Sequence, residues 1–361
     1  MSTVGIVGAG QLGQMLGFAA RALDVECVFL DPSAAPPASA AGQVLRFAFD
    51  DRGGLAELAA RADVLTYEFE NVPVQAVEEL TGTLDVFPPP GALRVAQDRL
   101  DEKTLFESLD IPTPPFHKVD SRNDLFAAAE AIGLPLVVKT RRLGYDGKGQ
   151  AVVRDASQIE TTWSKLGSAP LIAEQLVPFD YEVSAIGARD RAGRIVTYPL
   201  TRNAHVDGIL RTSLAPAGTP SLTEVATDYH ARLSDRLDYV GVLALELFVV
   251  GDRLLANEFA PRVHNSGHWT IEGAATSQFE NHLRAILGLP LGDTAAVGHA
   301  AMENLIGTMP ADVAGLTQAG YHVHDYGKEP RPGRKLGHIT VTAADASARD
   351  RDLAALQRLL K

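Results

Sequence analysis

Two apolar segments that each contain a single glutamate restrict the fold of this chain more than any other feature. Residues 242–250 read V-L-A-L-E-L-F-V-V and residues 254–260 read L-L-A-N-E-F-A, with a short turn over 251–253 between them. Apolar runs of this length around a glycine-containing turn predict a buried β-hairpin. A carboxylate inside a buried strand needs a partner, because taking a charge out of water without compensation is very unfavourable.

The length of the turn decides whether the two glutamates meet. Side chains alternate between the faces of a sheet, so a two-residue turn would place Glu246 and Glu258 on opposite faces. A three-residue turn over 251–253 pairs Val250 with Leu254 and brings the two glutamates together, and we expect this arrangement with a cation between the carboxylates. Hard oxygen ligands with room for phosphate oxygens and water favour magnesium. Two solvated acids in a hairpin are the alternative.

The segment after the second glutamate indicates a functional site beside the hairpin. Residues 257–270 read N-E-F-A-P-R-V-H-N-S-G-H-W-T and concentrate acidic, basic, amide and hydroxyl groups on one short stretch. Ordinary core segments are more uniformly apolar, and charged side chains are rarely buried without partners. Such a mixture next to a candidate metal site suits the binding of small polar molecules.

Composition limits the classes of protein that need to be considered. The chain has 361 residues, which predicts two or three domains, and its formal net charge of −12 argues against nucleic acid as the main partner. Neither a signal peptide nor an apolar stretch of membrane-spanning length is present, so we expect a cytoplasmic protein without a membrane partner. The single cysteine, Cys27, lies in an apolar run and is expected to be a buried strand residue.

The N-terminus contains a glycine fingerprint that is compatible with more than one role. Residues 3–16 read T-V-G-I-V-G-A-G-Q-L-G-Q-M-L and predict a strand, a turn and a helix. Gly8, Gly10 and Gly13 complete the pattern G-x-G-x-x-G, and Asp31 follows at the end of the next predicted strand, so a dinucleotide site is formally possible. The same turn also suits another phosphate at a helix N-terminus, or only tight packing of helix against strand.

A lysine and a glycine-rich loop indicate a second phosphate site in the middle of the chain. The predicted strand G-L-P-L-V-V-K-T carries Lys139 near its end, and the loop R-R-L-G-Y-D-G-K-G-Q follows at 141–150. Backbone amides of such a loop can surround phosphate oxygens while lysine supplies charge. The spacing excludes a Walker loop, and a plain hairpin turn is the alternative.

Other segments add weaker signals. Next to Glu174, exposed strand backbone can read the edge of an adenine, and Glu182 can accept hydrogen bonds from ribose hydroxyls. The proline cluster at 86–91 predicts a break between structural units. Basic residues are frequent in the turn-rich segment 326–341 near the C-terminus.

Together these pieces resemble the ATP-grasp superfamily. Lys139, the loop at 144–150, E-Q-L-V at 174–177, Glu182, Glu246 and N-E at 257–258 follow one another in the order found there. Within the superfamily the chain resembles, over essentially its full length, the 5-(carboxyamino)imidazole ribonucleotide synthetases. The motifs that carry this resemblance are G-A-G-Q-L-G-Q-M at 8–15, T-Y-E-F-E-N-V at 66–72, G-Y-D-G-K-G-Q at 144–150, H-V-D-G-I-L-R-T-S at 205–213, the segment 257–270 and R-P-G-R-K-L-G-H-I at 331–339.

The resemblance implies an α/β architecture with an ATP-grasp fold. It implies an N-terminal Rossmann-like domain with a parallel sheet over residues 1–97, an ATP-grasp domain with a glycine-rich lid over 98–295, and a small β-rich C-terminal domain over 296–361. It also implies a homodimer. In this family the N-terminal glycine turn serves the phosphate of a ribonucleotide and not NAD.

The resemblance also implies a ligase reaction. ATP would phosphorylate bicarbonate to carboxyphosphate, and the exocyclic amine of 5-aminoimidazole ribonucleotide would then be carboxylated, with release of ADP and phosphate, in de novo purine biosynthesis. Magnesium would be held by Glu246 and Glu258. The ATP contacts implied are Arg99, Lys139, Gly144, Tyr145, Asp146, Gly147, Lys148, Gly149, Gln150, Glu174, Gln175, Leu176, Val177, Glu182, His205, Asn257 and Glu258.

The remaining roles follow from the needs of this reaction. Bicarbonate must be held in line with the γ-phosphate, a task suited to Arg262, His264 and Asn265 beside Lys139. For His264, transfer of the amine proton and a neutral structural role are both open. The residues expected to bind the ribonucleotide are Gly10, Gln11, Leu12, Glu70, Tyr145, Lys328, Arg334 and Lys335.

Three other functions compete with this interpretation. An NAD-dependent oxidoreductase would use the N-terminal fingerprint, but it leaves Glu246, Glu258 and Lys139 without a role. A related ATP-grasp enzyme, such as a formate-using transformylase or a biotin carboxylase, is less consistent with R-V-H-N-S-G-H-W-T. A non-catalytic nucleotide sensor would not need an intact lysine, lid and acid pair.

Overall fold

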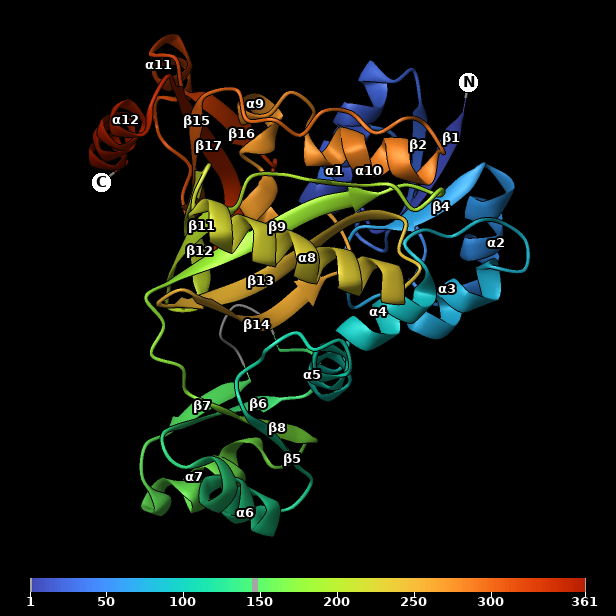
Figure 1. Ribbon diagram of the computed structural model, residues 1–361. Helices are drawn as coiled ribbons and strands as arrows, with labels where there is room; N and C mark the ends of the chain where they lie inside the picture. The colour runs from blue at the N-terminus through green and yellow to red at the C-terminus, as the bar shows by residue number, and fades with distance from the viewer. Residues whose placement is uncertain (1, 145–148, 361) are drawn as a thin grey trace.

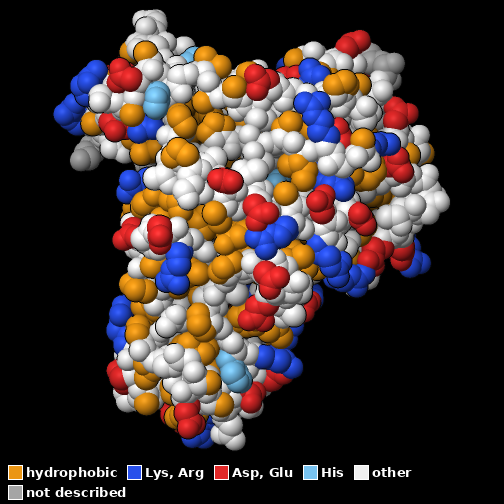
Figure 2. Space-filling model, in the orientation of Figure 1, with side chains coloured by type: hydrophobic (Ala, Val, Ile, Leu, Met, Phe, Trp, Pro, Cys, Tyr) orange, Lys and Arg blue, Asp and Glu red, His pale blue; other side chains and the backbone are white. Residues whose placement is uncertain are grey.

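The described residues form three β-sheets with helices on their faces (Figure 1). The computed structural model describes residues 2–144 and 149–360. In the space-filling view a small lobe projects from the main body, and acidic and basic side chains are interspersed over the visible face (Figure 2). Within the described residues, no helix has both the length and the apolar character needed to cross a membrane.

The N-terminal sheet is parallel and has the strand order β3-β2-β1-β4. Ile6 packs with helix α1, whereas Val7 packs with helices α2 and α3, so both faces of the sheet are covered. This is the Rossmann-like arrangement expected from the sequence, and Cys27 is a buried strand residue, as predicted. The elements are β1 (Thr3–Val7), α1 (Gln11–Ala22), β2 (Glu26–Leu30), the 3-10 helix η1 (Pro37–Ala40), β3 (Gln43–Leu45), α2 (Arg52–Ala60), β4 (Val64–Tyr67), α3 (Val74–Leu80) and α4 (Pro90–Ala96).

The small lobe is an antiparallel sheet of order β5-β8-β6-β7 with two helices packed against it. It presents Lys139 near the end of β6, where β6 pairs with β7 across the glycine-rich loop. Helix α5 (Arg99–Ser108) precedes it, and Asp98 caps that helix by accepting a hydrogen bond from the Leu100 amide. The lobe contains β5 (Phe116–Val119), α6 (Arg122–Ile132), β6 (Leu136–Thr140), β7 (Gln150–Val153), the 3-10 helix η2 (Ala156–Gln158), α7 (Ile159–Leu166) and β8 (Leu171–Gln175).

In the part of the chain that the structure describes, the central sheet has nine strands, and the C-terminal segment contributes three of them. Its order is β14-β13-β9-β11-β12-β15-β17-β16, with β10 paired to β9. The C-terminal segment is β-rich, as expected, but its strands continue the central sheet past β12 and do not form a sheet of their own. The elements are β9 (Tyr181–Arg189), β10 (Ile195–Thr197), β11 (Thr201–Val206), β12 (Ile209–Ala215), α8 (Pro220–Arg236), β13 (Gly241–Val250), β14 (Arg253–Ala260), the 3-10 helix η3 (Asn265–Gly267), α9 (Thr270–Gly273), α10 (Gln278–Ile286), β15 (His299–Ile306), α11 (Val313–Gln318), β16 (His322–Asp325), β17 (Lys335–Ala343) and α12 (Ala346–Leu359).

The predicted turn of the hairpin is wrong, although the predicted pairing of its two glutamates is confirmed. Val250 pairs with Arg253, so the turn contains two residues and not three. A β-bulge next to Asn257 then shifts the register by one residue, and Glu246 comes to lie opposite Glu258. A bulge places two residues of one strand against one residue of the other, which reverses the change of face that the shorter turn causes.

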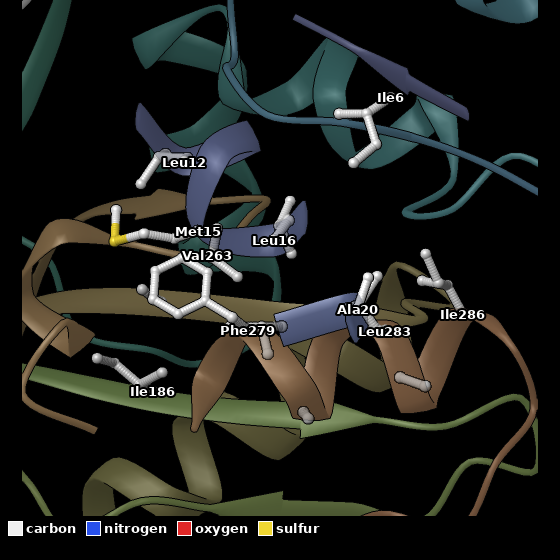
Figure 3. Close-up of a cluster of buried hydrophobic side chains, with 14 of the residues drawn as sticks. Ile6, Leu12, Met15, Leu16, Ala20, Ile186, Val263, Phe279, Leu283 and Ile286 are labelled. Carbon is white, nitrogen blue, oxygen red and sulfur yellow. The ribbon is translucent and has the colours of Figure 1, made fainter. Parts of the chain in front are cut away.

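A shared apolar core joins the N-terminal sheet to the central sheet. Figure 3 shows Leu12, Met15 and Leu16 of α1 beside Phe279 and Leu283 of α10. Each of these side chains is buried, and burial of one such side chain contributes about 1.5–3 kcal/mol. This packing holds the N-terminus of α1 close to the end of the hairpin.

Candidate active site

The largest set of predicted site residues meets in one cavity. The cavity has a volume of about 490 Å³ and lies where α1, the small lobe and the central sheet come together. The predicted residues that line it are Gln11, Leu12, Glu70, Arg99, Lys139, Gly144, Gln150, Glu182, His205, Glu246, Asn257, Glu258, Arg262, His264, Asn265 and Lys335.

Other predicted residues do not line this cavity. Glu174 is buried behind it, and Tyr145, Asp146, Gly147 and Lys148 lie outside the described residues. The others that the cavity wall does not include are Gly10, Gly149, Gln175, Leu176, Val177, Lys328 and Arg334.

The two hairpin glutamates form an oxygen-rich corner of the cavity. Glu246 and Glu258 are cross-strand neighbours, and Arg99 Nη1 donates to Glu258 Oε2 at 2.7 Å. Asn257 Oδ1 is buried and has no hydrogen-bond partner among the described residues. The described residues contain no cluster of three or more His, Cys, Asp or Glu side chains suited to a metal, so carboxylates alone would not complete a coordination shell. Two carboxylates and a free amide oxygen fit magnesium, which takes its other ligands from phosphate and water.

The pKa values of the two carboxyl groups move apart. Burial, together with the charge of Glu258, raises the pKa of Glu246 to about 7. Burial also acts to raise the pKa of Glu258, but the Arg99 guanidinium outweighs it and lowers that pKa to about 2. Glu258 is therefore ionised at neutral pH. A cation near Glu246 would favour the ionised form of that carboxyl group as well.

Lys139 is held by the carboxylate of Glu174, a residue that was expected from the sequence to contact ATP. Lys139 Nζ lies 3.0 Å from both oxygens of Glu174, and the buried Lys103 Nζ lies 3.4 Å from Glu174 Oε2. Lys103 also donates to the Ala256 carbonyl at 3.0 Å, which ties the lysine pair to β14. The Glu174 carboxylate thus positions Lys139 and does not face the cavity.

Lys103 was missed because its sequence context carries no signal. The sequence D-E-K at 101–103 in an amphipathic helix is typical of a solvent-exposed face. Its neighbour Glu102, also buried, accepts a hydrogen bond from the Phe259 amide at 2.6 Å.

Two stacked phenylalanines were also missed. The rings of Phe179 and Phe248 lie 4.8 Å apart with an interplanar angle of 10°, and both line the cavity. A signal for Phe248 existed, because it lies two residues beyond Glu246 in the same strand and therefore on the same face.

Glu182 and His205 form a pair on neighbouring strands. His205 Nδ1 lies 2.7 Å from Glu182 Oε2. Burial acts to lower the pKa of His205, but the Glu182 carboxylate outweighs it and raises that pKa. The pair lies on β9 and β11 beside the acid corner and lines the same cavity.

The segment with Arg262, His264 and Asn265 crosses the cavity from the end of β14. Arg262 Nε donates to Glu70 Oε2 at 2.5 Å. His264 Nε2 lies 3.1 Å from Glu246 Oε1, and burial together with the positive charge of Arg262 lowers the pKa of His264 to about 3. His264 is therefore neutral at physiological pH.

The segment is anchored from behind by helix α10. Gln278, which is fully buried, accepts a hydrogen bond from the His264 amide at 3.0 Å and donates one to the His264 carbonyl at 2.7 Å. Because both backbone groups of His264 are paired in this way, the side chains of the segment have a defined direction.

The hydrogen bonds of the N-terminal glycine turn contradict the prediction that the Gly10 amide binds phosphate. Glu68 accepts hydrogen bonds from the amides of Gly10, at 2.8 Å, and Gly13, at 2.9 Å. The Ala9 amide donates to Asp31 at 3.1 Å, so the acid of the fingerprint stabilises the turn itself. The Gly10 amide, predicted to bind phosphate, is already paired, and this leaves Gln11 and Leu12 at the cavity wall.

Comparison with known families agrees with this geometry. A model of the ATP-grasp domain matches residues 104–279, a model of the ribonucleotide synthetase preATP-grasp domain matches residues 1–97, and one of the phosphoribosylaminoimidazole carboxylase C-terminal domain matches residues 300–352. The fold, the lysine-bearing lobe and the acid pair at one cavity define an ATP-grasp enzyme.

Relatives that match the chain over nearly its whole length show which family of ATP-grasp enzymes it belongs to. The N5-carboxyaminoimidazole ribonucleotide synthase of Pseudomonas aeruginosa is 49% identical, with 99% of each chain covered, and that of Brucella melitensis is 50% identical, covering 94% of this chain and 96% of the relative. The crystal structure of the Thermus thermophilus enzyme has a TM-score of 0.95 and 52% identity, covering 99% of this chain and 98% of that one. The chain belongs to the N5-carboxyaminoimidazole ribonucleotide synthase family.

Membership of this family confirms the resemblance seen in the sequence. The chain is an ATP-dependent ligase of purine biosynthesis. The alternative that the glycine fingerprint belongs to an NAD-dependent oxidoreductase is wrong. A structure of the Aspergillus clavatus enzyme, with a TM-score of 0.91, 29% identity and coverage of 99% of this chain and 98% of that one, contains ADP and 5-aminoimidazole ribonucleotide.

Proposed function

We propose that this chain carboxylates 5-aminoimidazole ribonucleotide through carboxyphosphate. A bicarbonate oxygen attacks the γ-phosphorus of ATP and the bond to the bridging oxygen of ADP breaks. The exocyclic amine then attacks the carboxyl carbon of carboxyphosphate, phosphate leaves and the amine loses a proton. The observation that carries this proposal is the single cavity in which the acid pair, Lys139 and the Arg262–Asn265 segment meet the N-terminus of α1.

Phosphoryl transfer depends on positioning and on neutralising charge. Lys139, directed by Glu174, supplies a positive charge for the phosphates of ATP. Glu246, Glu258 and Asn257 would hold magnesium, which neutralises phosphate oxygens when it is bound. The glycine-rich loop 144–150 is proposed to cover the nucleotide and exclude water, because carboxyphosphate hydrolyses readily.

The rest of the nucleotide is proposed to lie along the central sheet. The stacked rings of Phe179 and Phe248 offer an apolar face for the base. Glu182, paired with His205, suits the ribose hydroxyls. The backbone of E-Q-L-V at 174–177 is proposed to read the edge of the base.

Bicarbonate is proposed to lie against Arg262 and Asn265. Arg262 brings a fixed positive charge, since its guanidinium is oriented by Glu70. A neutral His264 is suited to hydrogen bonding in the site and is not suited to act as an acid at physiological pH. For the ribonucleotide phosphate we propose the Gln11 and Leu12 amides together with Lys328, Arg334 and Lys335, with Tyr145 near the sugar or ring.

We further propose that the enzyme is a cytoplasmic homodimer whose domains divide at 97/98 and 295/296. Light scattering over a range of concentrations tests the oligomeric state, and a monomer at all concentrations would reject the dimer.

The test of the function is ADP release from magnesium-ATP, with bicarbonate and ribonucleotide added singly and together. We expect strong stimulation by the ribonucleotide only when bicarbonate is present. Glu258→Gln should reduce the rate by about a hundred- to a thousandfold, the range that a single essential electrostatic group contributes. Glu224→Gln makes the same change of charge at an exposed position on α8 and should behave as wild type. ADP release that is indifferent to the ribonucleotide would reject the substrate, and formate and biotin would be tried next.

A further inference from the structure

Asn265 faces the cavity with a carboxamide that another buried carboxamide holds in place. Asn304, on β15, is only 2% exposed. Its Nδ2 donates to Asn265 Oδ1 at 2.7 Å, and Asn265 Nδ2 donates to Asn304 Oδ1 at 3.1 Å. The two side chains therefore exchange a reciprocal pair of hydrogen bonds. Asn304 itself does not line the cavity.

The orientation of both carboxamides is determined by a main-chain carbonyl. Asn304 Nδ2 also donates to the Leu210 carbonyl at 2.9 Å. A carbonyl oxygen can only accept, so the atom of Asn304 that faces it must be the nitrogen. With Asn304 oriented, the oxygen of Asn265 must face Asn304 Nδ2, and one hydrogen of Asn265 Nδ2 must face Asn304 Oδ1.

This arrangement leaves Asn265 with one uncommitted N–H. A carboxamide nitrogen has two hydrogens, and only one of them is used by Asn304. In the described part of the chain no other acceptor is paired with Asn265 Nδ2. A free N–H in the cavity that Arg262 also lines suits an anionic oxygen, because a hydrogen bond to a charged acceptor is stronger than one between neutral groups.

We propose that Asn304 is a positioning residue that directs the free N–H of Asn265 at the bicarbonate oxygen. The inference rests on the proposed function and adds to it a residue outside the cavity. It also explains why a buried asparagine occupies β15, where an apolar side chain would otherwise pack without needing partners. Leu210 lies on β12, opposite His205 of β11, so the same contacts tie η3 to the strand that pairs with the one carrying a proposed ATP residue.

Steady-state kinetics of Asn304→Ala test the proposal. We expect the KM for bicarbonate to rise at least tenfold, with the KM for ATP changing less than twofold. A purely structural role would disturb both substrates alike. Asn304→Asp keeps the shape of the side chain and removes both donors, so it should show the same selectivity if Asn304→Ala fails to fold. Thr340→Val on β17 is the control, because Thr340 is buried and its hydroxyl has no partner among the described residues.

A double variant shows whether Asn304 acts through Asn265. If it does, Asn304→Ala should add nothing to the bicarbonate KM of Asn265→Ala, because coupled residues are not additive. Additive effects, equal changes in both KM values, or no change would each overturn the proposal.

A measurement that needs no turnover separates this proposal from the proposed function. The Asn265 side-chain N–H resonances, assigned with Asn265→Ala in asparagine-labelled protein, should move in Asn304→Ala and stay in place in Thr340→Val. Unchanged resonances in Asn304→Ala overturn the proposal even if the wild type shows no carboxylation. Shifted resonances in a protein without bicarbonate-dependent ADP release would support the positioning and reject the function.

Discussion

At the scale of single residues, buried partners decide what each active-site side chain can do. Lys139 is directed by Glu174, and Glu174 in turn is shared with the buried Lys103. Burial beside Arg262 keeps His264 neutral, so of the two roles open from the sequence, proton uptake from the amine is the less favourable. The assignment of Lys139 depends on neighbours that are distant in the chain.

Lys328 gives a pH-dependent prediction at this scale. Burial, helped by the positive charge of Arg334, lowers the pKa of Lys328 to about 8. A lowered pKa means that the ammonium charge is present below pH 8 and is lost as the pH rises through that value. If Lys328 binds the ribonucleotide phosphate, the KM for ribonucleotide should rise roughly tenfold between pH 7 and pH 9.5, the worth of one hydrogen bond to a charged group.

The control for this prediction is Lys328→Arg, since arginine remains charged over the whole range. In this variant the KM for ribonucleotide should change little between pH 7 and pH 9.5. An equally steep rise in Lys328→Arg would show that another group is responsible.

At the scale of elements, the hairpin and helix α10 place the reactive segment. The bulge at Asn257 compensates for the two-residue turn, so with this turn the two glutamates lie opposite each other only because the bulge is present. Helix α10 then holds the backbone of His264 through Gln278.

Gln278→Ala tests this anchoring. The substitution leaves the N–H of His264 unpaired, whereas the C=O of His264 keeps the hydrogen bond that it accepts from the Gly267 amide at 3.0 Å. One unpaired group of this kind costs about 1–3 kcal/mol, so the free energy of unfolding should fall by about 1–3 kcal/mol. Urea denaturation measures the loss. Gln318→Ala, at an exposed position on α11, should change stability by less than about 0.5 kcal/mol. Equal behaviour of the two variants would show that the anchoring contributes little.

At the scale of the whole molecule, the site exists only because distant segments are locked together. His282 Nδ1 accepts from the Val242 amide, so its Nε2 carries the hydrogen that is donated to Thr66 in the N-terminal sheet at 2.9 Å. Arg191 reaches back from the central sheet to Asp85 at 2.9 Å. Lys328 of the C-terminal segment hydrogen-bonds Gln11 at the start of α1.

Ligand binding across these segments should stabilise the whole protein. At a magnesium-ATP concentration one hundred times its Kd, binding contributes about 2.7 kcal/mol and should raise the Tm by several degrees. Chelation of magnesium should remove most of this shift, and Glu258→Gln should show little of it. A full shift in the presence of a chelator would contradict the role proposed for the acid pair.

The sequence predicted the fold class and most of the cavity wall, for identifiable reasons. The strand carrying Lys139 and the glycine fingerprint are local patterns, and local patterns report secondary structure and turns directly. The pairing of Glu246 with Glu258 was correct although the turn was not, because the β-bulge at Asn257 restores the register that the shorter turn changes. No local pattern in the sequence indicated that Lys103 is buried.

By itself, then, the sequence determined which chemical groups this protein possesses, their order along the chain and the elements that carry them. The tertiary structure decided which of those groups are free to react. Glu68, and not a phosphate, pairs with the Gly10 amide, Glu174 lies behind Lys139, and Asn304 orients Asn265 from another strand. Hydrogen bonds and charge pairs act over about 3 Å. Partners far apart in the chain therefore meet only after the sheets have packed.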